Sequence, residues 1–235
     1  MNVLELFSGT RSIGKVCDQL GWSSVSVDLI LPADHQVDIM KFDYKQYPKN
    51  HFDIVWASPP CTAYSNLQSC WLGRKKAGGV FTQEKMDSDM NDADFIVKKT
   101  LEIIEYFNCE YWFMENPQTG KLKSREFMKD IPFYDVSYCM YSDWGYEKRT
   151  RIWTNKKDWN NKICDKSGSC GNMVDSQHKL TCDGGYDKRK KHKLNVVNDV
   201  HTIGEAKDKG KLKKGTNQLD RYRIPEELIF SLFLD

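Results

Sequence analysis

Short apolar runs alternate with helix-like segments over the first 155 residues, and this alternation constrains the fold more than any other feature. Four runs have the length and composition of strands: Val3–Phe7, Ser24–Leu29, His51–Ala57 and Tyr111–Met114. Lys15–Leu20 and Ala93–Phe107 have the spacing of apolar side chains that is typical of helices. Tyr134–Tyr138 and Thr150–Thr154 are candidates for a closing pair of strands. We therefore predict an α/β fold, with an open, mainly parallel sheet and helices on both faces.

A cluster of polar or reactive residues follows each of the predicted core strands. In chain order these clusters are Ser8–Gly14, Asp28, Ser58–Cys61 and Glu115–Pro117. In open parallel sheets, ligands bind beyond the carboxyl ends of the strands. We therefore expect the four clusters to form one site at that edge of the sheet.

Charge is unevenly distributed along the chain, although the formal net charge is only +2. Residues 1–147 contain 15 Lys and Arg against 21 Asp and Glu, a net of −6, whereas residues 148–223 contain 20 against 9, a net of +11. A basic stretch beside an acidic domain is expected when one region binds a polyanion such as nucleic acid. A solvated lysine-rich loop is the alternative interpretation of the same residues.

The composition also indicates where the protein acts. No apolar run approaches the roughly 18 residues of a membrane-spanning helix, and Met1 leads into the first strand without a signal-like segment. The eight cysteines are scattered and follow no export signal, so a disulfide framework is not expected. We expect an intracellular protein, in the cytoplasm or nucleoid, or in a nucleus or viral factory, that does not bind membranes.

Residues Phe7–Gly14 have the composition of a tight turn between a strand and a helix. A glycine-containing turn lets the backbone approach a ligand and directs helix N–H groups at an acidic group, although tight turns also need glycine for steric reasons alone. Asp28 ends the second predicted strand, where a carboxylate can accept hydrogen bonds from ribose hydroxyls. No G-x-x-x-x-G-K-[ST] motif is present, which favours a nucleoside cofactor without a triphosphate.

Three further positions carry reactive chemistry. Two prolines fix the backbone before Cys61, which favours a nucleophilic thiol over the small buried side chain that a lone cysteine usually is. Glu115 can be held protonated in a partly desolvated site and can then donate to a ring nitrogen. Arg149 and Arg151 share one face of an extended segment, where two guanidinium groups suit a carbonyl oxygen or phosphates, unless they belong to a basic surface strand.

Together these motifs resemble the C5-cytosine DNA methyltransferase family, in order and spacing, over about the first 155 residues. Phe7–Gly9 with Gly14 is similar to the motif that binds S-adenosylmethionine, and Pro59–Cys61 is similar to the nucleophile motif. Glu115–Asn116 matches the catalytic Glu-Asn pair, and Glu147–Arg151 resembles the Gln-x-Arg-x-Arg motif. The resemblance implies a Rossmann-like S-adenosylmethionine-dependent methyltransferase sheet with a small irregular basic lobe.

The resemblance also implies a role for each residue. Cys61 is the nucleophile, Glu115 hydrogen-bonds the cytosine N3, and Arg149 and Arg151 bind the side of the base that carries O2. Asp28 contacts the cofactor's ribose. The full set implied to bind the cofactor, with Asp38 against its adenine, is Phe7, Ser8, Gly9, Thr10, Ile13, Gly14, Asp28, Leu29, Asp38, Ile39 and Pro59.

The implied activity is methyl transfer to C5 of a cytosine flipped out of DNA, through a covalent Cys61 adduct. The implied partner is DNA, bound by a monomer, in a restriction-modification context. An RNA (tRNA) cytosine methyltransferase would use the same catalytic groups. A catalytically degenerate DNA-binding relative is a further alternative, which the presence of Cys61, Glu115 and Arg151 disfavours. An amino-methyltransferase is disfavoured because Cys61 stands where that chemistry uses an aromatic residue.

The chain departs from the family pattern at several positions. The usual Gln, Phe, Val and Gln are replaced by Thr62, Tyr64, Pro117 and Glu147. Arg11 and Ser12 fill a stretch that is normally glycine-rich, and Arg223–Pro225 is the nearest analogue of the C-terminal motif. None of these changes removes a group that the chemistry requires, so we expect an active member, similar to compact phage or viral ones.

We expect three parts in the chain. Residues 1–155 form the cofactor-binding catalytic domain, residues 156–222 a small basic target-recognition lobe, and residues 223–235 a C-terminal helix that packs back on the catalytic domain.

Within the lobe, four candidate metal ligands have the spacing C-x5-C-x7-H-x3-C: Cys164, Cys170, His178 and Cys182. Four such ligands within nineteen residues can fold a segment without a core around a structural zinc ion. The spacing has no tight C-x2-C knuckle, so free reduced cysteines are the alternative. His192 and His201 are alternative ligands.

Overall fold

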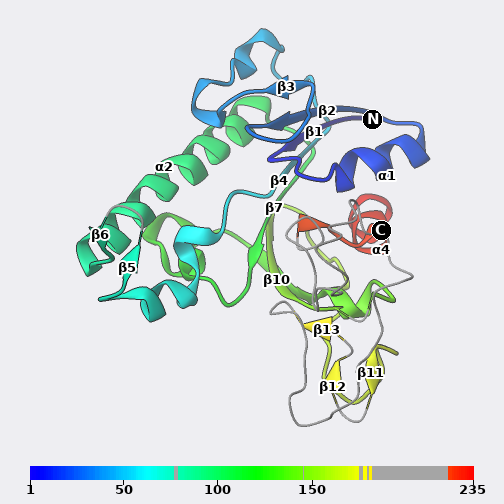
Figure 1. Cartoon of the computed structure of the whole chain (residues 1–235). Helices are drawn as coiled ribbons and strands as arrows, with labels where there is room; N and C mark the ends of the chain where they lie inside the picture. Colours follow the sequence, from blue (N-terminus) through cyan, green and yellow to red (C-terminus); the bar gives the residue numbers. More distant parts are fainter. Residues whose placement is uncertain (77–78, 145, 175–176, 179, 182–221) are drawn as a thin grey trace, which may run out of the picture. The chain divides into compact units, whose positions relative to one another are not determined.

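A computed structural model describes residues 1–76, 79–144, 146–174, 177–178, 180–181 and 222–235 (Figure 1). The chain divides into two compact units: Met1–Tyr134 with Thr150–Asp158, and Asp135–Arg149 with Trp159–Asp235. The predicted boundaries at residues 155 and 222 stay a prediction, because most of the basic lobe lies outside the described residues. Within the described residues, no helix combines the length and the apolar character that crossing a bilayer requires.

A seven-stranded sheet of order β3-β2-β1-β4-β7-β10-β8 organises the first unit. Its strands are β1 (Asn2–Leu6), β2 (Ser23–Asp28), β3 (His35–Gln36), β4 (Ile54–Ala57), β7 (Tyr111–Pro117), β8 (Phe133–Ser137) and β10 (Arg149–Thr154). β3, β2, β1, β4 and β7 pair in parallel, and β10 runs antiparallel to β7. The boundary between the two units falls within β8 and just after the first residue of β10. The predicted α/β fold is confirmed.

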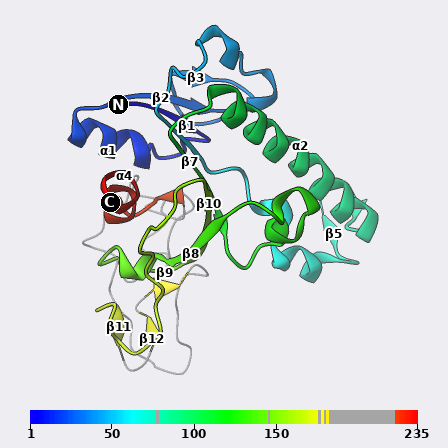
Figure 2. The ribbon, with the colours of Figure 1, turned by 180° about the vertical axis from the view of Figure 1, so that it is seen from behind.

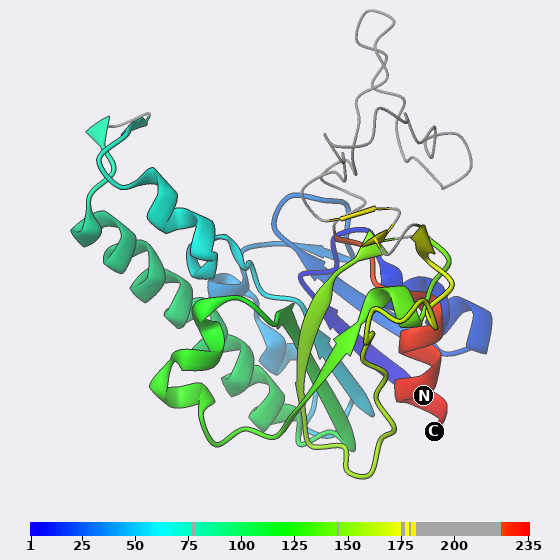
Figure 3. The same ribbon diagram turned by 90° about the horizontal axis from the view of Figure 1, so that it is seen from below.

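Two helices cover the sheet from opposite sides. Helix α1 (Ser12–Leu20) connects β1 to β2, and α2 (Gln83–Phe107) connects β4 to β7. The two connections run in opposite directions along the strand order, so right-handed crossovers place the helices on opposite faces. Figure 3 shows α1 and α2 on either side of the strands. Strand order reverses between β1 and β4, which is the point where such sheets bind ligands.

Buried side chains fill both faces of the central strands, as expected for a parallel sheet between helices. On one face, Leu4, Leu6, Val55 and Ala57 belong to the apolar core that includes α2 residues such as Phe107. The alternate residues of the same two strands are also buried: Val3, Glu5, Ile54 and Trp56. Strand alternation directs these to the face covered by α1. Glu5 is therefore a carboxyl group placed in an apolar layer.

Helix α2 begins ten residues before the predicted helix. Thr82 caps it, since its side-chain oxygen accepts from the backbone N–H of Lys85, and Glu84 lies in the positive first turn. The first turns are mostly exposed and lack the apolar periodicity on which the prediction relied. Shorter elements of this unit are β5 (Lys75–Lys76), β6 (Gly79–Val80), η1 (Ile39–Lys41), η2 (Tyr44–Gln46), η3 (Thr62–Tyr64), η4 (Asn66–Trp71), η5 (Lys121–Ser124) and η6 (Glu126–Met128).

The described residues of the second unit form short elements and one helix (Figure 2). Its described elements are η7 (Tyr138–Met140), β9 (Tyr146–Glu147), β11 (Met173–Val174), β12 (Gln177–His178), β13 (Leu180–Thr181) and α4 (Glu226–Leu234). β11 and β12 form a short antiparallel ladder, and β13 runs parallel to β9. Residues 159–172 contain neither helix nor strand. Helix α4 buries Leu228, Ile229 and Leu232.

Candidate active site

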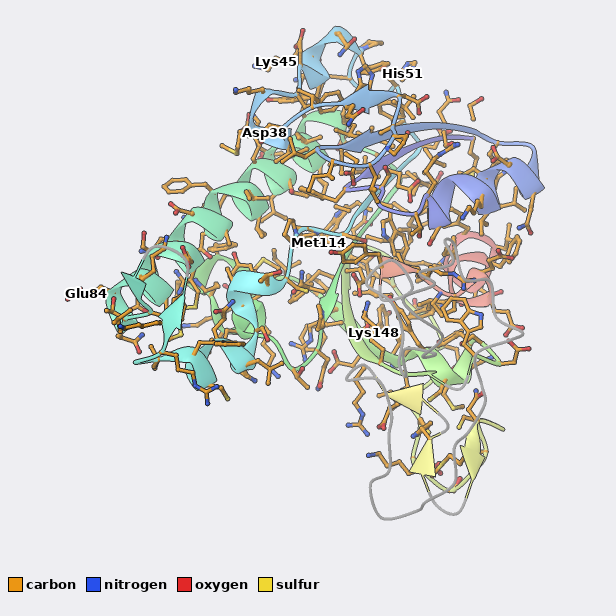
Figure 4. All side chains as sticks on the ribbon, in the orientation of Figure 1. Asp38, Lys45, His51, Glu84, Met114 and Lys148 are labelled. Atoms are coloured by element: carbon orange, nitrogen blue, oxygen red, sulfur yellow. The ribbon has the colours of Figure 1, made fainter. Side chains whose placement is uncertain are left out.

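The ends of β4 and β7 bring two of the predicted motifs to one edge of the sheet. Ala57 lies opposite Met114, which is labelled in Figure 4. Cys61 follows four residues after Ala57, and Glu115 is the residue directly after Met114. Glu115 is buried, whereas Cys61 is partly exposed. Cys61 is therefore partly open to solvent, and Glu115, on the neighbouring strand, is largely withdrawn from water.

A buried hydrogen bond joins the two motifs. The side-chain Nδ2 of Asn116 donates to the carbonyl oxygen of Pro59 at 2.9 Å, and both residues are buried. The turn that follows Asn116 leaves little room for a side chain at Gly120, where a Cβ would lie 3.1 Å from the carbonyl oxygen of Pro117. Asn66 adds an exposed tie, donating to the carbonyl oxygen of Thr119 at 2.7 Å. The loop that carries Cys61 is thus attached to the strand that carries Glu115.

The residues after Cys61 are anchored to α2. Buried Tyr64 donates from its hydroxyl to Asp94 at 2.9 Å, and the Asp94 carboxylate is paired with the guanidinium of Arg125. Burial, together with the neighbouring Asp94, raises the pKa of the Tyr64 hydroxyl far above its usual range. This arrangement explains why Tyr64 replaces the family's usual Phe, because the extra hydroxyl has a buried acceptor in this chain.

The two predicted arginines lie on β10. Arg151 pairs with Asn116 across the antiparallel ladder, and Ile152 pairs with Glu115. Directly opposite residues share a face, so Arg151 leaves the sheet on the side of Asn116. Its guanidinium carbon lies 3.5 Å from the centre of the Phe133 ring, a stacked cation–π contact. Arg149 is exposed and belongs to the second unit.

The turn after β1 and the loop after β2 meet at Asp28. One carboxylate oxygen accepts from the backbone N–H of Gly9 at 2.9 Å, and the other accepts from Ile30 and Leu31 at 2.9 and 2.8 Å. Leu29 and Ile30 are exposed beside it. Ser8 is buried, and within the described residues its hydroxyl has no hydrogen-bond partner. Polar and apolar groups are therefore presented together at this edge.

The carboxylate that contacts the start of α1 is that of Glu5, a residue of β1. Its two carboxylate oxygens accept from the backbone N–H groups of Ile13 and Gly14 at 3.1 and 3.0 Å. The turn was expected to direct helix N–H groups at an acidic group, and in the structure that acidic group is the Glu5 carboxylate of the chain itself. Burial raises the pKa of Glu5 to about 7, outweighing the two N–H donors, which lower it. We missed Glu5 in the sequence, although a single acid within Val3–Leu6 was a visible signal.

The departure from a glycine-rich turn also has a local explanation. A Cβ on Gly14 would lie 2.8 Å from Nη2 of Arg11, so glycine here leaves room for the arginine. Arg11 has φ 55° and donates to the Ser24 hydroxyl at 3.4 Å. The Thr10 hydroxyl lies 3.3 Å from the hydroxyl of Ser12. The motif alone did not predict that this turn accommodates an arginine side chain.

Asp38 and Ile39 lie after β3, where Asp38 is labelled in Figure 4. The Asp38 carboxylate caps η1 by accepting from the backbone N–H of Met40 at 2.9 Å, and Ile39 is buried. The cap orients the loop but occupies only one of the carboxylate oxygens.

Three of the predicted metal ligands come together in the second unit. Cys164, Cys170 and His178 lie with Cys139, and one ligand atom from each is within 4.8 Å of all the others. The fourth predicted ligand, Cys182, lies outside the described residues. Cys139 was missed because it precedes Cys164 by 25 positions and shares no local motif with it. No disulfide joins the seven cysteines that the structure describes.

Comparison with known proteins gives one relative of nearly full length. "Probable DNA (cytosine-5)-methyltransferase" of Frog virus 3 (isolate Goorha) is 36% identical over 241 residues, which cover 99% of this chain and 98% of that protein. No family model matches the chain.

Three solved structures are also similar, each over part of its length. A putative DNA modification methyltransferase encoded within an E. coli prophage has a TM-score of 0.46 at 12% identity, covering 66% of this chain and 46% of that one. The S. pombe Dnmt2 methyltransferase has a TM-score of 0.43 at 13% identity, with coverages of 75% and 57%. Entamoeba histolytica EhMeth has a TM-score of 0.46 at 16% identity, with coverages of 70% and 55%. This chain thus spans about half the length of these structures.

The viral relative decides the family, because its similarity runs through both chains almost from end to end. The resemblance of the motifs is thereby confirmed. The chain belongs to the DNA (cytosine-5)-methyltransferase family.

Proposed function

We propose that this chain is an active enzyme that transfers a methyl group from S-adenosylmethionine to C5 of cytosine in DNA. The observation that carries the proposal is the buried hydrogen bond between Asn116 and Pro59, which ties the loop of the nucleophile Cys61 to the strand of Glu115. This bond fixes the segment that carries Cys61 relative to the segment that carries Glu115, the two groups that act on opposite sides of the C5–C6 addition in the proposed reaction. The relative's name, which specifies DNA and cytosine C5, supports the same reaction.

The edge formed by β1, β2 and β4 fits S-adenosylmethionine. When bound, this cofactor supplies an electrophilic methyl group on a sulfonium ion. The Asp28 carboxylate, held by three backbone donors, still has about one lone pair, on Oδ2, for a ribose hydroxyl. The exposed side chains of Leu29 and Ile30 offer apolar surface for a base, and the unpartnered Ser8 hydroxyl offers a hydrogen bond. Asp38 hydrogen-bonds the adenine, and the Gly9 backbone, which has no side chain, leaves room for the cofactor.

Cys61 begins the chemistry. Cytosine C5 is a poor nucleophile, and attack of the thiolate on C6, forming an Sγ–C6 bond, makes C5 enamine-like. Glu115 donates a proton to N3 or hydrogen-bonds it, which stabilises the charge that develops on the ring. C5 would then attack the methyl carbon, and the bond from that carbon to the sulfonium sulfur would break, leaving a neutral thioether. Loss of the C5 proton to a base and return of the electron pair break the Sγ–C6 bond, which restores the aromatic ring and frees Cys61.

Arg151, with Arg149, binds the side of the cytosine that carries O2. These atoms are inaccessible within a stacked duplex, so the target base is flipped out of the helix. The basic residues 156–222 hold the DNA backbone, and the release of counterions from DNA contributes to binding. DNA is thus the proposed partner, and a monomer binds it. The reaction takes place inside a cell, as part of a viral life cycle or of a restriction-modification system.

The test is a covalent trap. Duplex DNA carrying 5-fluorocytosine forms a stable adduct because no C5 proton can leave, and we expect this adduct from the wild type but not from Cys61→Ala. Cys70→Ala is the matched control, since Cys70 is an exposed cysteine on η4 outside the motif. Normal methyl transfer by Cys61→Ala would overturn the mechanism. Transfer to tRNA but not to duplex DNA would overturn the substrate, and DNA binding without transfer would indicate a degenerate relative.

A further inference from the structure

We infer that the second unit holds a structural zinc ion, bound by the thiolates of Cys139, Cys164 and Cys170 and by the imidazole of His178. The four residues come from three separate segments: η7, the irregular segment 159–172, and β12. The inference concerns the fold of this unit and does not depend on methyl transfer.

The spacing of the four ligand atoms fits a tetrahedral metal. With Zn–S bonds of about 2.3 Å and a Zn–N bond of about 2.0 Å, sulfur and nitrogen ligands at the corners of a tetrahedron lie about 3.5 Å apart. The His178 Nε2 atom lies 3.4 Å from the Sγ of Cys164 and 3.6 Å from the Sγ of Cys170. All four ligand atoms lie within 4.8 Å of one another, so a single ion is within reach of all of them.

The other nitrogen of His178 is held as in a metal site. Its Nδ1 lies 3.2 Å from a carboxylate oxygen of Glu147, and the side chain is only 2% exposed. A carboxylate on one ring nitrogen fixes the tautomer, so the lone pair of the other nitrogen faces the three sulfurs. Glu147 therefore acts as a positioning residue, and it also pairs with Lys166 at 3.2 Å.

The backbone around the cluster is arranged for negatively charged sulfur. The N–H of Lys166, two residues after Cys164, lies 3.4 Å from the Cys164 Sγ, and Lys166 adopts the left-handed φ of 64° that this turn needs. Buried Asn172 donates from its side chain to the carbonyl oxygens of Cys139 and Cys170, at 2.8 and 3.1 Å. Two of the proposed ligands are thus fixed relative to each other before any metal binds.

The local fold needs such a link. Residues 159–172 have no helix or strand, and irregular segments of this length are uncommon in compact units unless something else holds them. A metal ion that joins this segment to η7 and β12 supplies that constraint. Three cysteines and one histidine form a closed ligand set of the kind found in structural zinc sites, with no position left for water or substrate.

The site also has a consequence for catalysis, which rests on the proposed function. Glu147 ends β9 and lies two residues before Arg149, the first arginine of the motif on β10. It occupies the position of the family's usual Gln, and its carboxylate is used to orient His178. Loss of zinc is therefore expected to weaken DNA binding while cofactor binding is retained.

The direct test is the metal content of the purified full-length chain. We expect about one zinc ion per chain, and X-ray absorption at the zinc edge should show three sulfur ligands and one nitrogen. Cobalt(II) exchanged into the site should give the charge-transfer absorption of thiolate ligands. A chain that carries no zinc and binds no cobalt, or one in which these cysteines form a disulfide, overturns the inference whether or not the enzyme methylates DNA.

Variants identify the ligands. Cys139→Ser should lose the metal or bind it much more weakly. Two control variants should retain it: Cys182→Ser, at the ligand predicted from the sequence, and Cys109→Ser, at a cysteine outside the cluster. Retention by Cys139→Ser with loss in Cys182→Ser would overturn the assignment of Cys139. If Cys139→Ser does not fold, Glu147→Gln decides: it keeps every ligand, and we expect metal affinity to fall roughly 10- to 100-fold in a chelator competition. Unchanged affinity in Glu147→Gln would refute its role in positioning His178.

Discussion

The buried tie between Asn116 and Pro59 can be tested by Asn116→Ala. The change removes the Nδ2 donor and leaves the Pro59 carbonyl without its 2.9 Å partner in a buried position. A buried acceptor that loses its partner costs about 1–3 kcal/mol. If the loop that carries Cys61 must hold the bonded geometry to react, this free energy corresponds to a roughly 5- to 150-fold slower formation of the covalent adduct.

The assay measures three quantities on the same variant. The rate of adduct formation with 5-fluorocytosine DNA reports the position of Cys61, and calorimetry reports the affinity for S-adenosylmethionine. Urea unfolding gives the free energy of unfolding, which we expect to fall by about 1–3 kcal/mol. Cofactor affinity should fall less than the rate of adduct formation, because Asn116 contacts the proposed cofactor set only through the carbonyl oxygen of Pro59 and not at β1 or β2.

Asn66→Ala is the matched control. Asn66 makes the same kind of bond between the same two segments, to Thr119 at 2.7 Å, but in an exposed position where water replaces the lost partner. Its free energy of unfolding should change by less than about 0.5 kcal/mol, and its adduct should form at nearly the wild-type rate. Equal effects in the two variants would refute the reasoning, because burial would then have no bearing on the role of the tie.

Three further predictions concern the rest of the chain. Asp28→Ala should weaken S-adenosylmethionine binding in calorimetry, because a ribose acceptor and the common partner of Gly9 and Ile30 are lost together; unchanged affinity would refute this placement of the cofactor. Burial raises the pKa of Glu5 to about 7, so its favourable contribution is complete below about pH 4.5 and is lost as the pH rises through 7. Glu5→Gln should therefore gain up to about 3 kcal/mol over the wild type across this range in urea unfolding, and parallel pH profiles would contradict it. Replacing residues 188–191 (KRKK) with Ala should flatten the salt dependence of DNA affinity by up to about one unit per lost contact, and an unchanged slope would show that this run does not contact DNA.

The central sheet was predictable because its signal is local. Buried parallel strands are short and continuously apolar, and each ends in a change of composition that marks a turn. The extent of α2 was not predictable to the same degree. Its first turns extend from Thr82 over exposed polar residues, and there the helix depends on capping rather than on an apolar face. The apolar pattern therefore predicted the central and final turns of the helix, whereas its first residue is set by the Thr82 cap.

The candidate site divides along the same line. Cys61 and Glu115 lie in motifs of consecutive residues, so their meeting at one sheet edge follows from the order of the strands. Cys139 joins Cys164 only through the folding of an irregular segment, which no spacing rule describes. Glu5 is visible in the sequence as a lone acid in an apolar run, but its role is not, because its partners, backbone N–H groups at the start of α1, carry no sequence signature.

The departures from the family pattern have a common physical explanation. At two of them the unusual side chain has a specific buried or half-buried partner in this chain: Tyr64 donates to Asp94, and Glu147 accepts at the ring nitrogen of His178. At a third, Gly14 leaves the space that Arg11 fills. A buried polar group without a partner costs free energy, so such a substitution persists only where the partner is also present. These positions therefore belong to pairs, and a variant that restores the family's usual residue at one member removes or weakens a specific contact of the other. That coupling explains how the chain can depart from the motif beside Cys61 and beside Arg149 while the residues implied to act in the reaction are still present in its sequence.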